Sequence, residues 1–334
     1  MSDAPASAMT TSCPSEPPVE GPWRPTTGHA PGRLAHTSEP LCSARSRVRI
    51  VSTDVSPPAR ARVEAGLDDL VRENRFTIAV VFPLFGAVLL VASAESLLPA
   101  SLNFNPYLII LGTLVMRLPL VAGLAPVIDR RAAAGLLLLT GYAYGIEYVG
   151  VLTGVPYGSF DYGVELGPML LDTVPLGLPV FFFPLVVNAY LLCLLLLGPR
   201  AESTGTRLAS VIGVVLLMDL ALDPGAVALT FWAYDPAGPY YGVPWSNYAG
   251  WVLSATVAVV TLDTTLDRTG LRDRLARCEF MLDDLVSFVV LWGLINAYFG
   301  NWIPVVLAGG LGIALLATDR FDFDVRPSLP SLGG

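Results

Sequence analysis

From residue 76 onward, the chain repeatedly contains apolar segments long enough for a helix to cross a bilayer. Such a helix rises 1.5 Å per residue and must cover roughly 30 Å of hydrocarbon. Eight segments qualify, at approximately residues 76–98, 106–127, 132–152, 174–197, 208–231, 249–266, 285–299 and 302–318. The seventh is short and is followed by Gly300-Asn301, so six spans plus a C-terminal hairpin are the alternative. The pattern predicts an all-α, polytopic membrane helix bundle.

The composition supports a membrane protein and excludes a soluble globular enzyme. Hydrophobic residues make up 53% of the chain, charged residues only 14%, and the mean hydropathy is +0.60. The net charge of −8 argues against a nucleic-acid partner, which needs a basic surface. All 20 basic residues are arginine, and this acidic, lysine-free composition is typical of a salt-loaded cytoplasm.

The chain divides into three parts. Residues 1–72 are rich in Pro, Ser, Thr, Ala and Arg without helical or strand periodicity, which predicts a disordered extension that is not a secretory signal. Residues 73–320 form the transmembrane domain, and residues 321–334 a short tail. The four cysteines lie far apart and indicate neither a disulfide framework nor a zinc site.

The arginines predict the orientation in a cell membrane, because cytoplasmic loops carry the excess of positive charge. Apart from Arg117, they lie before the first segment, between segments 2 and 3, 4 and 5, 6 and 7, and after the eighth. The alternate loops, at residues 99–105, 153–173, 232–248 and 300–301, contain none. We therefore expect both termini to be cytoplasmic.

Two of the arginine-free loops carry aromatic residues between Gly/Pro turns. Seven Trp or Tyr residues lie between Trp232 and Trp251. An ordinary interfacial belt would explain them, but their density favours a binding surface. Both loops contain Gly-Val-Pro-aromatic, at residues 154–157 and 242–245, which agrees equally with an internal duplication and with chance.

Five charged residues within the apolar segments stand out. Each costs on the order of 2.5 to 3.5 kcal/mol at a helix centre, so each needs a reason to be there. They are Glu95, Arg117, Glu147, Asp219 and Asp223. The simplest interpretation is that the arginine neutralises one acid and the others touch interfacial water. The alternative is a site, since Asp219 and Asp223 share one helix face and can present two carboxyls to one cavity.

Several chemistries are excluded by missing residues. Both histidines lie in the first 36 residues, so the membrane domain lacks the histidine cluster of di-iron hydroxylases. The chain also lacks a dinucleotide-binding fingerprint after a strand, a Gly-x-Ser-x-Gly elbow and a Walker sequence. We therefore expect no metal and no cofactor.

Carboxylic acids and aromatic rings can hydrate an alkene unaided. A carboxylic acid kept protonated by apolar surroundings can protonate a trisubstituted double bond, and water captures the resulting tertiary cation. Aromatic faces stabilise the cation, while a second, ionised carboxylate orients the water. Two acids in unequal environments fit these roles.

Three other functions compete with this hypothesis. Asp219-x-x-x-Asp223 could bind Mg²⁺-diphosphate as in membrane prenyltransferases, although the second Asp-rich segment and the cationic residues are missing. A transporter would retain intramembrane acids but should show polar residues along a path across the membrane. A membrane protein that only binds an apolar pigment would keep the aromatics and tolerate loss of the acids.

Residues 147–162, 219–224 and 238–251 resemble the CruF-type carotenoid hydratases. The most specific parts are Leu-Asp-Pro at 222–224 and Tyr-Tyr-Gly-Val-Pro at 240–244, within a resemblance that covers roughly residues 75–320. It implies a cofactor-independent enzyme that adds water to the terminal double bond of a carotenoid within the bilayer. With the acidic, lysine-free composition, the chain looks most like the haloarchaeal branch, which converts bisanhydrobacterioruberin to bacterioruberin. Other carotenoid-biosynthesis enzymes are the partners we expect.

The catalytic roles of individual residues are assigned from the chemistry of acid-catalysed hydration and not from the resemblance. We expect Asp219 or Asp223 to donate the proton and Glu147 to act as the base. The expected substrate and water contacts are Tyr157, Tyr162, Asp172, Trp232, Tyr234, Tyr240, Tyr241, Asn247 and Trp251.

Overall fold

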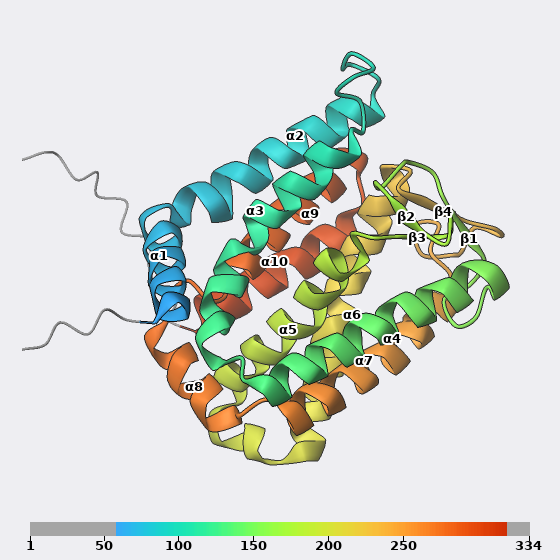
Figure 1. Ribbon diagram of the computed structural model, residues 1–334. Coiled ribbons are helices and arrows are strands. Elements are labelled where there is room, and N and C mark those ends of the chain that lie inside the picture. Colours follow the sequence, from blue (N-terminus) through green and yellow to red (C-terminus); the bar gives the residue numbers. More distant parts are fainter. Residues whose placement is uncertain (1–57, 319–334) are drawn as a thin grey trace, which may run out of the picture. The chain divides into compact units, whose positions relative to one another are not determined.

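The computed structural model describes residues 58–318, and within this range it confirms the all-α helix bundle (Figure 1). The part of the expected N-terminal extension before residue 58 and the tail after residue 318 lie outside the described residues. Four strands of two or three residues accompany the helices: β1 (Phe160–Tyr162), β2 (Met169–Leu170), β3 (Val174–Pro175) and β4 (Trp232–Tyr234).

Each of the eight apolar segments contains a helix. In chain order, these helices are η1 (Thr77–Val81) continued by α2 (Phe82–Ala94), α3 (Pro106–Leu124) continued by η2 (Ala125–Val127), α4 (Arg130–Thr153), α5 (Leu178–Leu197) continued by η3 (Gly198–Glu202), α6 (Thr204–Ala228), α7 (Trp245–Thr265), α9 (Asp283–Phe299) and α10 (Trp302–Leu316). By length and composition, five of them can cross a membrane, and α7 with the short helix α8 (Arg268–Arg277), bent by 95°, makes a sixth candidate. At 1.5 Å per residue, α9 and α10 fall short of roughly 30 Å, so their lengths favour six spans plus a hairpin over eight crossings.

One helix lies where the sequence predicted disorder. Ala59–Glu73 form α1, within the stretch assigned to the N-terminal extension. Val63, Leu67 and Val71 recur every four residues, which is the apolar spacing of an amphipathic helix, and Val71 is buried in the core of the bundle. Arg60 donates to the carbonyl oxygens of Ala125 and Ile128 at the end of η2, and Asp68 accepts from Arg274 of α8 at 2.7 Å. The helix therefore has both an apolar face and polar contacts with the bundle, and the expectation of disorder was wrong for this segment.

The arginine-bearing connections gather at the end of the bundle that holds α1 and α8, and the strands lie at the other end (Figure 1). There, Arg207 of α6 binds Asp263 of α7, and Arg272 of α8 binds Glu202 of η3. The segregation of arginine to one end is therefore a property of the fold. That this end faces the cytoplasm stays a prediction.

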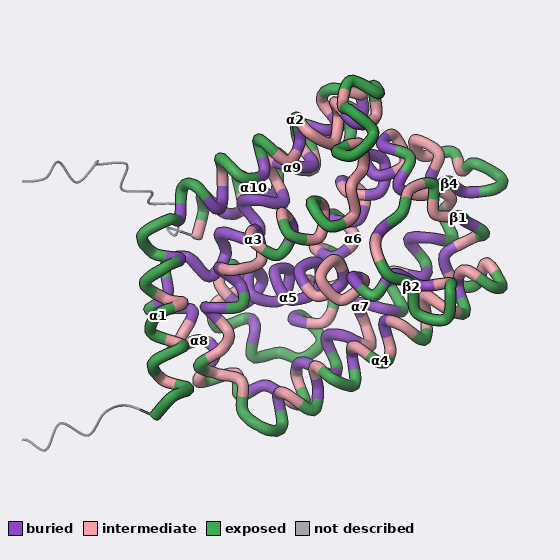
Figure 2. Tube along the Cα trace, turned by 45° about the horizontal axis from the view of Figure 1, so that its top comes forward, coloured by how far each residue is buried: buried purple, intermediate pink, exposed green. Residues whose placement is uncertain are grey.

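A buried helix and two buried ion pairs hold the bundle together. Figure 2 shows that α5 is buried along most of its length. Helix α9 begins with Asp283 and Asp284, which are 2% and 0% exposed. Asp283 accepts from Arg75 at 2.8 Å, while Asp284 accepts from Arg117 of α3 and Asn188 of α5. Arg117 does neutralise an acid, as the simplest interpretation required, but that acid is Asp284 and none of the acids singled out above.

The chain from α4 to α7 contains two helix–strand–helix units. The first consists of α4, β1 and α5, and the second of α6, β4 and α7. β1 begins at residue 160 and β4 at residue 232, which is 72 residues later, and the same shift places α4 on α6 and α5 on α7. The two Gly-Val-Pro sequences are 88 residues apart and do not correspond in this way. The order of elements is therefore repeated, but the repeat does not lie at the motif that hinted at a duplication, and the duplication itself stays a prediction.

Replacing Asp284 should test the tie between α3 and α9. Asp284→Ala leaves the Arg117 guanidinium buried without its partner, and we expect it to lower the free energy of unfolding by about 3–5 kcal/mol. The double variant Arg117→Met/Asp284→Leu removes both charges and should lose less. Thermal unfolding in detergent micelles measures both; a double variant less stable than the single one would contradict the structural role.

Candidate active site

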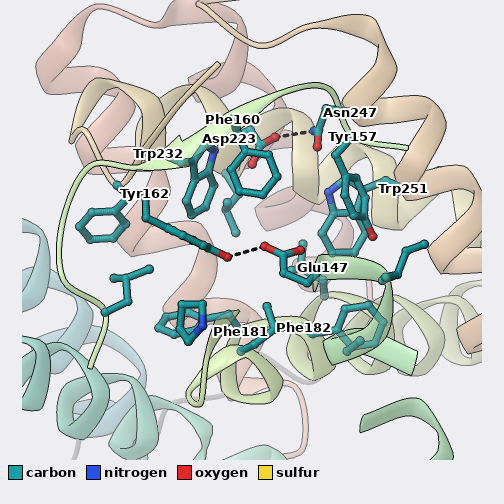
Figure 3. A pocket seen from close by; sticks show the side chains of 18 of the residues that line it. Glu147, Tyr157, Phe160, Tyr162, Phe181, Phe182, Asp223, Trp232, Asn247 and Trp251 are labelled. Atoms are coloured by element: carbon teal, nitrogen blue, oxygen red, sulfur yellow. Dashed lines mark hydrogen bonds between the residues drawn. The ribbon is translucent and has the colours of Figure 1, made fainter. Parts of the chain in front are cut away.

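A cavity of about 130 Å³ lies where the two units meet, between the β1–β4 pair and the ends of α4, α5, α6 and α7 that are nearest to it (Figure 3). Its walls are mainly aromatic and aliphatic. Eight of the residues expected from the sequence line it: Glu147, Tyr157, Tyr162, Asp223, Trp232, Tyr234, Asn247 and Trp251. Residues from two loops and three helices thus form one site.

The antiparallel pairing of β1 with β4 forms one wall of the cavity. Phe160 lies opposite Tyr234, and Tyr162 lies opposite Trp232. Successive side chains of a strand point to opposite faces, so these four rings share one face and the intervening Asp161 points away. All four rings line the cavity, while Asp161 is exposed.

Helix α6, which carries Asp219 and Asp223, contains a proline beside the site. Pro224 has no N–H to donate to the carbonyl oxygen of Leu220 four residues earlier. The hydroxyl of Tyr240 donates to that oxygen instead, at 3.2 Å. Asn296 of α9 donates to the carbonyl of Ala221 at 2.7 Å. The proline therefore lets side chains from other elements hold the turn that carries Asp223.

Asn247 joins the two aspartates of α6. Its side-chain amide nitrogen donates to Oδ2 of Asp219 at 3.0 Å and to Oδ2 of Asp223. The hydroxyl of Tyr234 also donates to Oδ2 of Asp223, at 3.4 Å. Asp219 is fully buried and does not line the cavity, whereas Asp223, 3% exposed, does. Of the two expected donors, Asp223 is the one that can reach a ligand.

Glu147 of α4 faces Asp223 from across the cavity (Figure 3). The hydroxyl of Tyr162 donates to its Oε1. Burial, together with the neighbouring carboxyl, raises the pKa of Tyr162 well above its usual range, and burial beside Asp223 does the same for the pKa of Tyr234. Both phenols therefore stay protonated and act as hydrogen-bond donors to the carboxyls.

The charge of the cavity is unbalanced. Among the described residues that line it, two are acids and none is basic. Burying several carboxylates beside one another without a cation is costly, so the arrangement favours keeping a proton on at least one of them. A site for a diphosphate would need the opposite charge.

Three of the expected contact residues do not line the cavity. Tyr240 supports the Pro224 turn, and Tyr241 accepts from the backbone N–H of Ile303 at 3.4 Å. Asp172 is exposed in the turn between β2 and β3 and has a positive φ of 54°. Aromatic density and loop position indicated a binding region but not which side chains point inward.

Other lining residues carried no recognisable sequence signal. Phe160 alternates with Tyr162 and could have been identified once β1 was known. The remaining aromatic lining residues lie in apolar segments where phenylalanine and tryptophan are unremarkable: Phe181, Phe182, Phe231 and Trp292. The ring of Phe182 stacks on Trp251, with centroids 5.9 Å apart.

Comparison with known proteins places this site in a family. The family model described as "Carotenoid biosynthesis protein" matches residues 104–315. A bisanhydrobacterioruberin hydratase from Haloarcula japonica is 64% identical over 269 residues, which are 80% of this chain and 92% of that protein. No solved structure matches the chain.

Replacing Tyr240 should test its supporting role. Tyr240→Phe removes the donor to the Leu220 carbonyl, and we expect it to lower the free energy of unfolding by about 1 kcal/mol. Tyr107→Phe is the matched control, because Tyr107 is 70% exposed. Denaturation of both variants in the same detergent measures the difference; equal stabilities would show that the hydroxyl contributes nothing.

Proposed function

We propose that this chain, which belongs to the carotenoid biosynthesis protein family, hydrates the terminal double bonds of bisanhydrobacterioruberin to give bacterioruberin. The relative from Haloarcula japonica carries that activity in its name. The observation that best supports the mechanism is the position of Asp223 and Glu147, which face one apolar cavity from opposite helices without a basic residue among its described lining.

Asp223 is the proton donor in this mechanism. Its Oδ2 accepts hydrogen bonds from Asn247 and Tyr234, so that oxygen does not carry the proton. A proton on Oδ1 is free to pass to the substrate carbon. Transfer to the terminal CH of the double bond leaves the positive charge on the tertiary carbon and the negative charge on Asp223.

Glu147 is the base. Tyr162 holds its Oε1, which leaves Oε2 free to accept a proton from water. The water oxygen bonds to the tertiary carbon while Glu147 takes one of its protons, giving a neutral tertiary alcohol. Return of that proton from Glu147 to Asp223 restores the enzyme, so the cycle consumes only water.

The aromatic wall supports the charged intermediate. Tertiary cations are attracted to the faces of aromatic rings, and the effect increases when water is excluded. Phe160, Trp232 and Trp251 line the cavity that holds both acids. The cavity has room for one end of the substrate, and we propose that the rest of the polyene lies in lipid.

The alternative functions find less support. Prenyl transfer would require basic groups for a diphosphate, and no described residue lining the cavity is basic. For a transporter, Arg117 would be the clearest part of a polar path, but it is bound to Asp284 at the junction of α3, α5 and α9. A binding protein would have no use for the shared amide donor between Asp219 and Asp223.

We also propose the cell membrane as the location. Substrate and product are apolar and would move through the bilayer, where other carotenoid-biosynthesis enzymes supply the substrate. The expected disordered extension carries no chemistry in this mechanism.

Deleting the gene, in a strain without a second copy, should lead to accumulation of carotenoids lighter by one or two waters. Re-expression of the intact gene should restore the hydrated pigment, whereas Asp223→Asn should not, because an amide cannot deliver the proton. Chromatography with mass spectrometry of extracted pigments measures both. Unchanged pigments in the deletion strain would overturn the proposed function.

Glu147→Gln should slow hydration by roughly 10²–10⁴-fold, the usual contribution of a general base. The matched control is Asp161→Asn, which removes an exposed carboxyl from the outer face of the same wall. Initial rates of product formation with the purified protein measure both variants. Equal rates in the two variants would exclude Glu147 as the base.

A further inference from the structure

The turn Gly300-Asn301, which joins α9 to α10, lies against the helix that carries Asp223. Asn301 is buried, and its side-chain amide nitrogen donates to the carbonyl oxygen of Pro224 in α6 at 3.2 Å. The same nitrogen donates to Oδ1 of Asn296 in α9 at 3.0 Å. Both protons of this amide are therefore used, one on each helix.

The amide of Asn296 is also fully engaged. This residue is completely buried, and its nitrogen donates to the carbonyl oxygen of Ala221 in α6 at 2.7 Å and to that of Trp292, one turn earlier in α9, at 2.8 Å. Because its Oδ1 accepts from Asn301, the amide has one orientation, in which a donor points at α6. The two asparagines thus form one network that binds the α6 backbone at two carbonyl groups.

The proline in α6 explains why this helix needs donors from outside. Pro224 removes one backbone hydrogen bond, and its ring crowds the preceding turn, so this part of the helix is loosened. Ala221 and Pro224, whose carbonyl oxygens the asparagines bind, lie two residues before and one residue after Asp223. In apolar surroundings, water is not available to take over such bonds. The backbone position of Asp223 is therefore set by α9 and its turn as well as by α6.

Helices α6 and α9 also approach each other most closely at this point. A Cβ atom at Gly225 would lie 2.9 Å from the ring of Trp292 and 3.1 Å from the amide nitrogen of Asn296, so a larger residue would force the helices apart. Trp292 lines the cavity and shares one face of α9 with Asn296, four residues later. At the start of α9, Asp283 and Asp284 bind arginines. The helix is thus held at both ends and can act as a fixed support for the turn that carries Asp223.

We infer that Asn296 and Asn301 are positioning residues that fix the place from which Asp223 delivers its proton. This inference rests on the proposed function. Neither asparagine is among the described residues that line the cavity, so both act through the α6 backbone and not on the substrate. Proton transfer to carbon needs the donor oxygen close to the double bond, and a misplacement of about 1 Å can lower a rate on the order of 10²-fold.

Asn296→Leu tests this role, because leucine has a similar shape and cannot donate. Purified protein in lipid nanodiscs is given bisanhydrobacterioruberin at increasing mole fraction, and chromatography measures the initial rate of alcohol formation. We expect kcat to fall roughly ten- to a hundredfold. KM should change by less than about twofold, because the variant leaves the walls of the cavity in place. Asn301→Ala, which removes the bond to Pro224 and frees the Asn296 amide to rotate, should lower kcat by a smaller factor with the same unchanged KM.

Ser287→Ala is the matched control on the same helix. The buried hydroxyl of Ser287 lies 3.3 Å from the carbonyl oxygens of Ile78 and Asp283, so its loss also removes a buried donor from α9 but leaves α6 untouched. We expect this variant to lower the thermal midpoint of unfolding and to keep kcat within about twofold of the wild type. Thermal unfolding of all three variants shows whether the fold is intact; if Asn296→Leu does not fold, Asn301→Ala decides the test.

The outcomes distinguish this inference from the function on which it rests. A wild type that forms no alcohol would overturn the proposed function. A wild type that forms alcohol, with the folded asparagine variants retaining its kcat, would overturn the positioning role alone. A fall in kcat for Ser287→Ala as large as that for the asparagine variants would also overturn it, because lost stability and not the position of Asp223 would then explain the lower rate.

Discussion

The antiparallel pairing of β1 with β4 is the contact on which the site depends. It joins the loops that follow α4 and α6, and it turns the last residue of each strand toward a carboxyl group of its own unit. Tyr162 donates to Glu147, and Tyr234 donates to Asp223. Without this pairing, neither phenol would have a fixed position, and the two acids would face an open gap between helices. Three residue pairs of sheet thus organise chemistry carried by two long helices.

Buried carboxyls have two different uses in this bundle. Asp283 and Asp284 are as deeply buried as Asp223, but each binds an arginine, and together they tie α9 to neighbouring segments. The acids of the cavity receive hydrogen bonds from neutral donors, an amide and two phenols. An arginine partner would hold a carboxylate ionised and end its use as an acid. Neutral donors fix the position of a carboxyl while leaving it free to carry a proton.

Most of the helices could be predicted because twenty apolar residues in succession have few alternatives to a helix in a membrane. Glu147 and Asp223 could be predicted because an acid is costly there and therefore conspicuous. Helix α1 was missed because its short apolar face, formed by Val63, Leu67 and Val71, directly follows a stretch rich in Pro, Ser and Arg whose composition predicts disorder. Tyr240 and Tyr241 were grouped with the lining residues because composition does not show which way a ring points. Trp292 gave no signal, since one tryptophan in an apolar helix is ordinary.

The correspondence between the two units explains how one cavity obtains unlike groups. A shift of 72 residues relates Glu147 to Asp219, Phe160 to Trp232, Tyr162 to Tyr234 and Pro175 to Asn247. All of these residues except Asp219 line the cavity. The order of elements is therefore repeated, but the second unit has an amide and an indole where the first has a proline and a phenylalanine, and it carries Asp223 as an additional acid. A reaction that protonates one carbon and delivers water to its neighbour needs such unlike groups on its two sides, and here the differences between two similar units supply them.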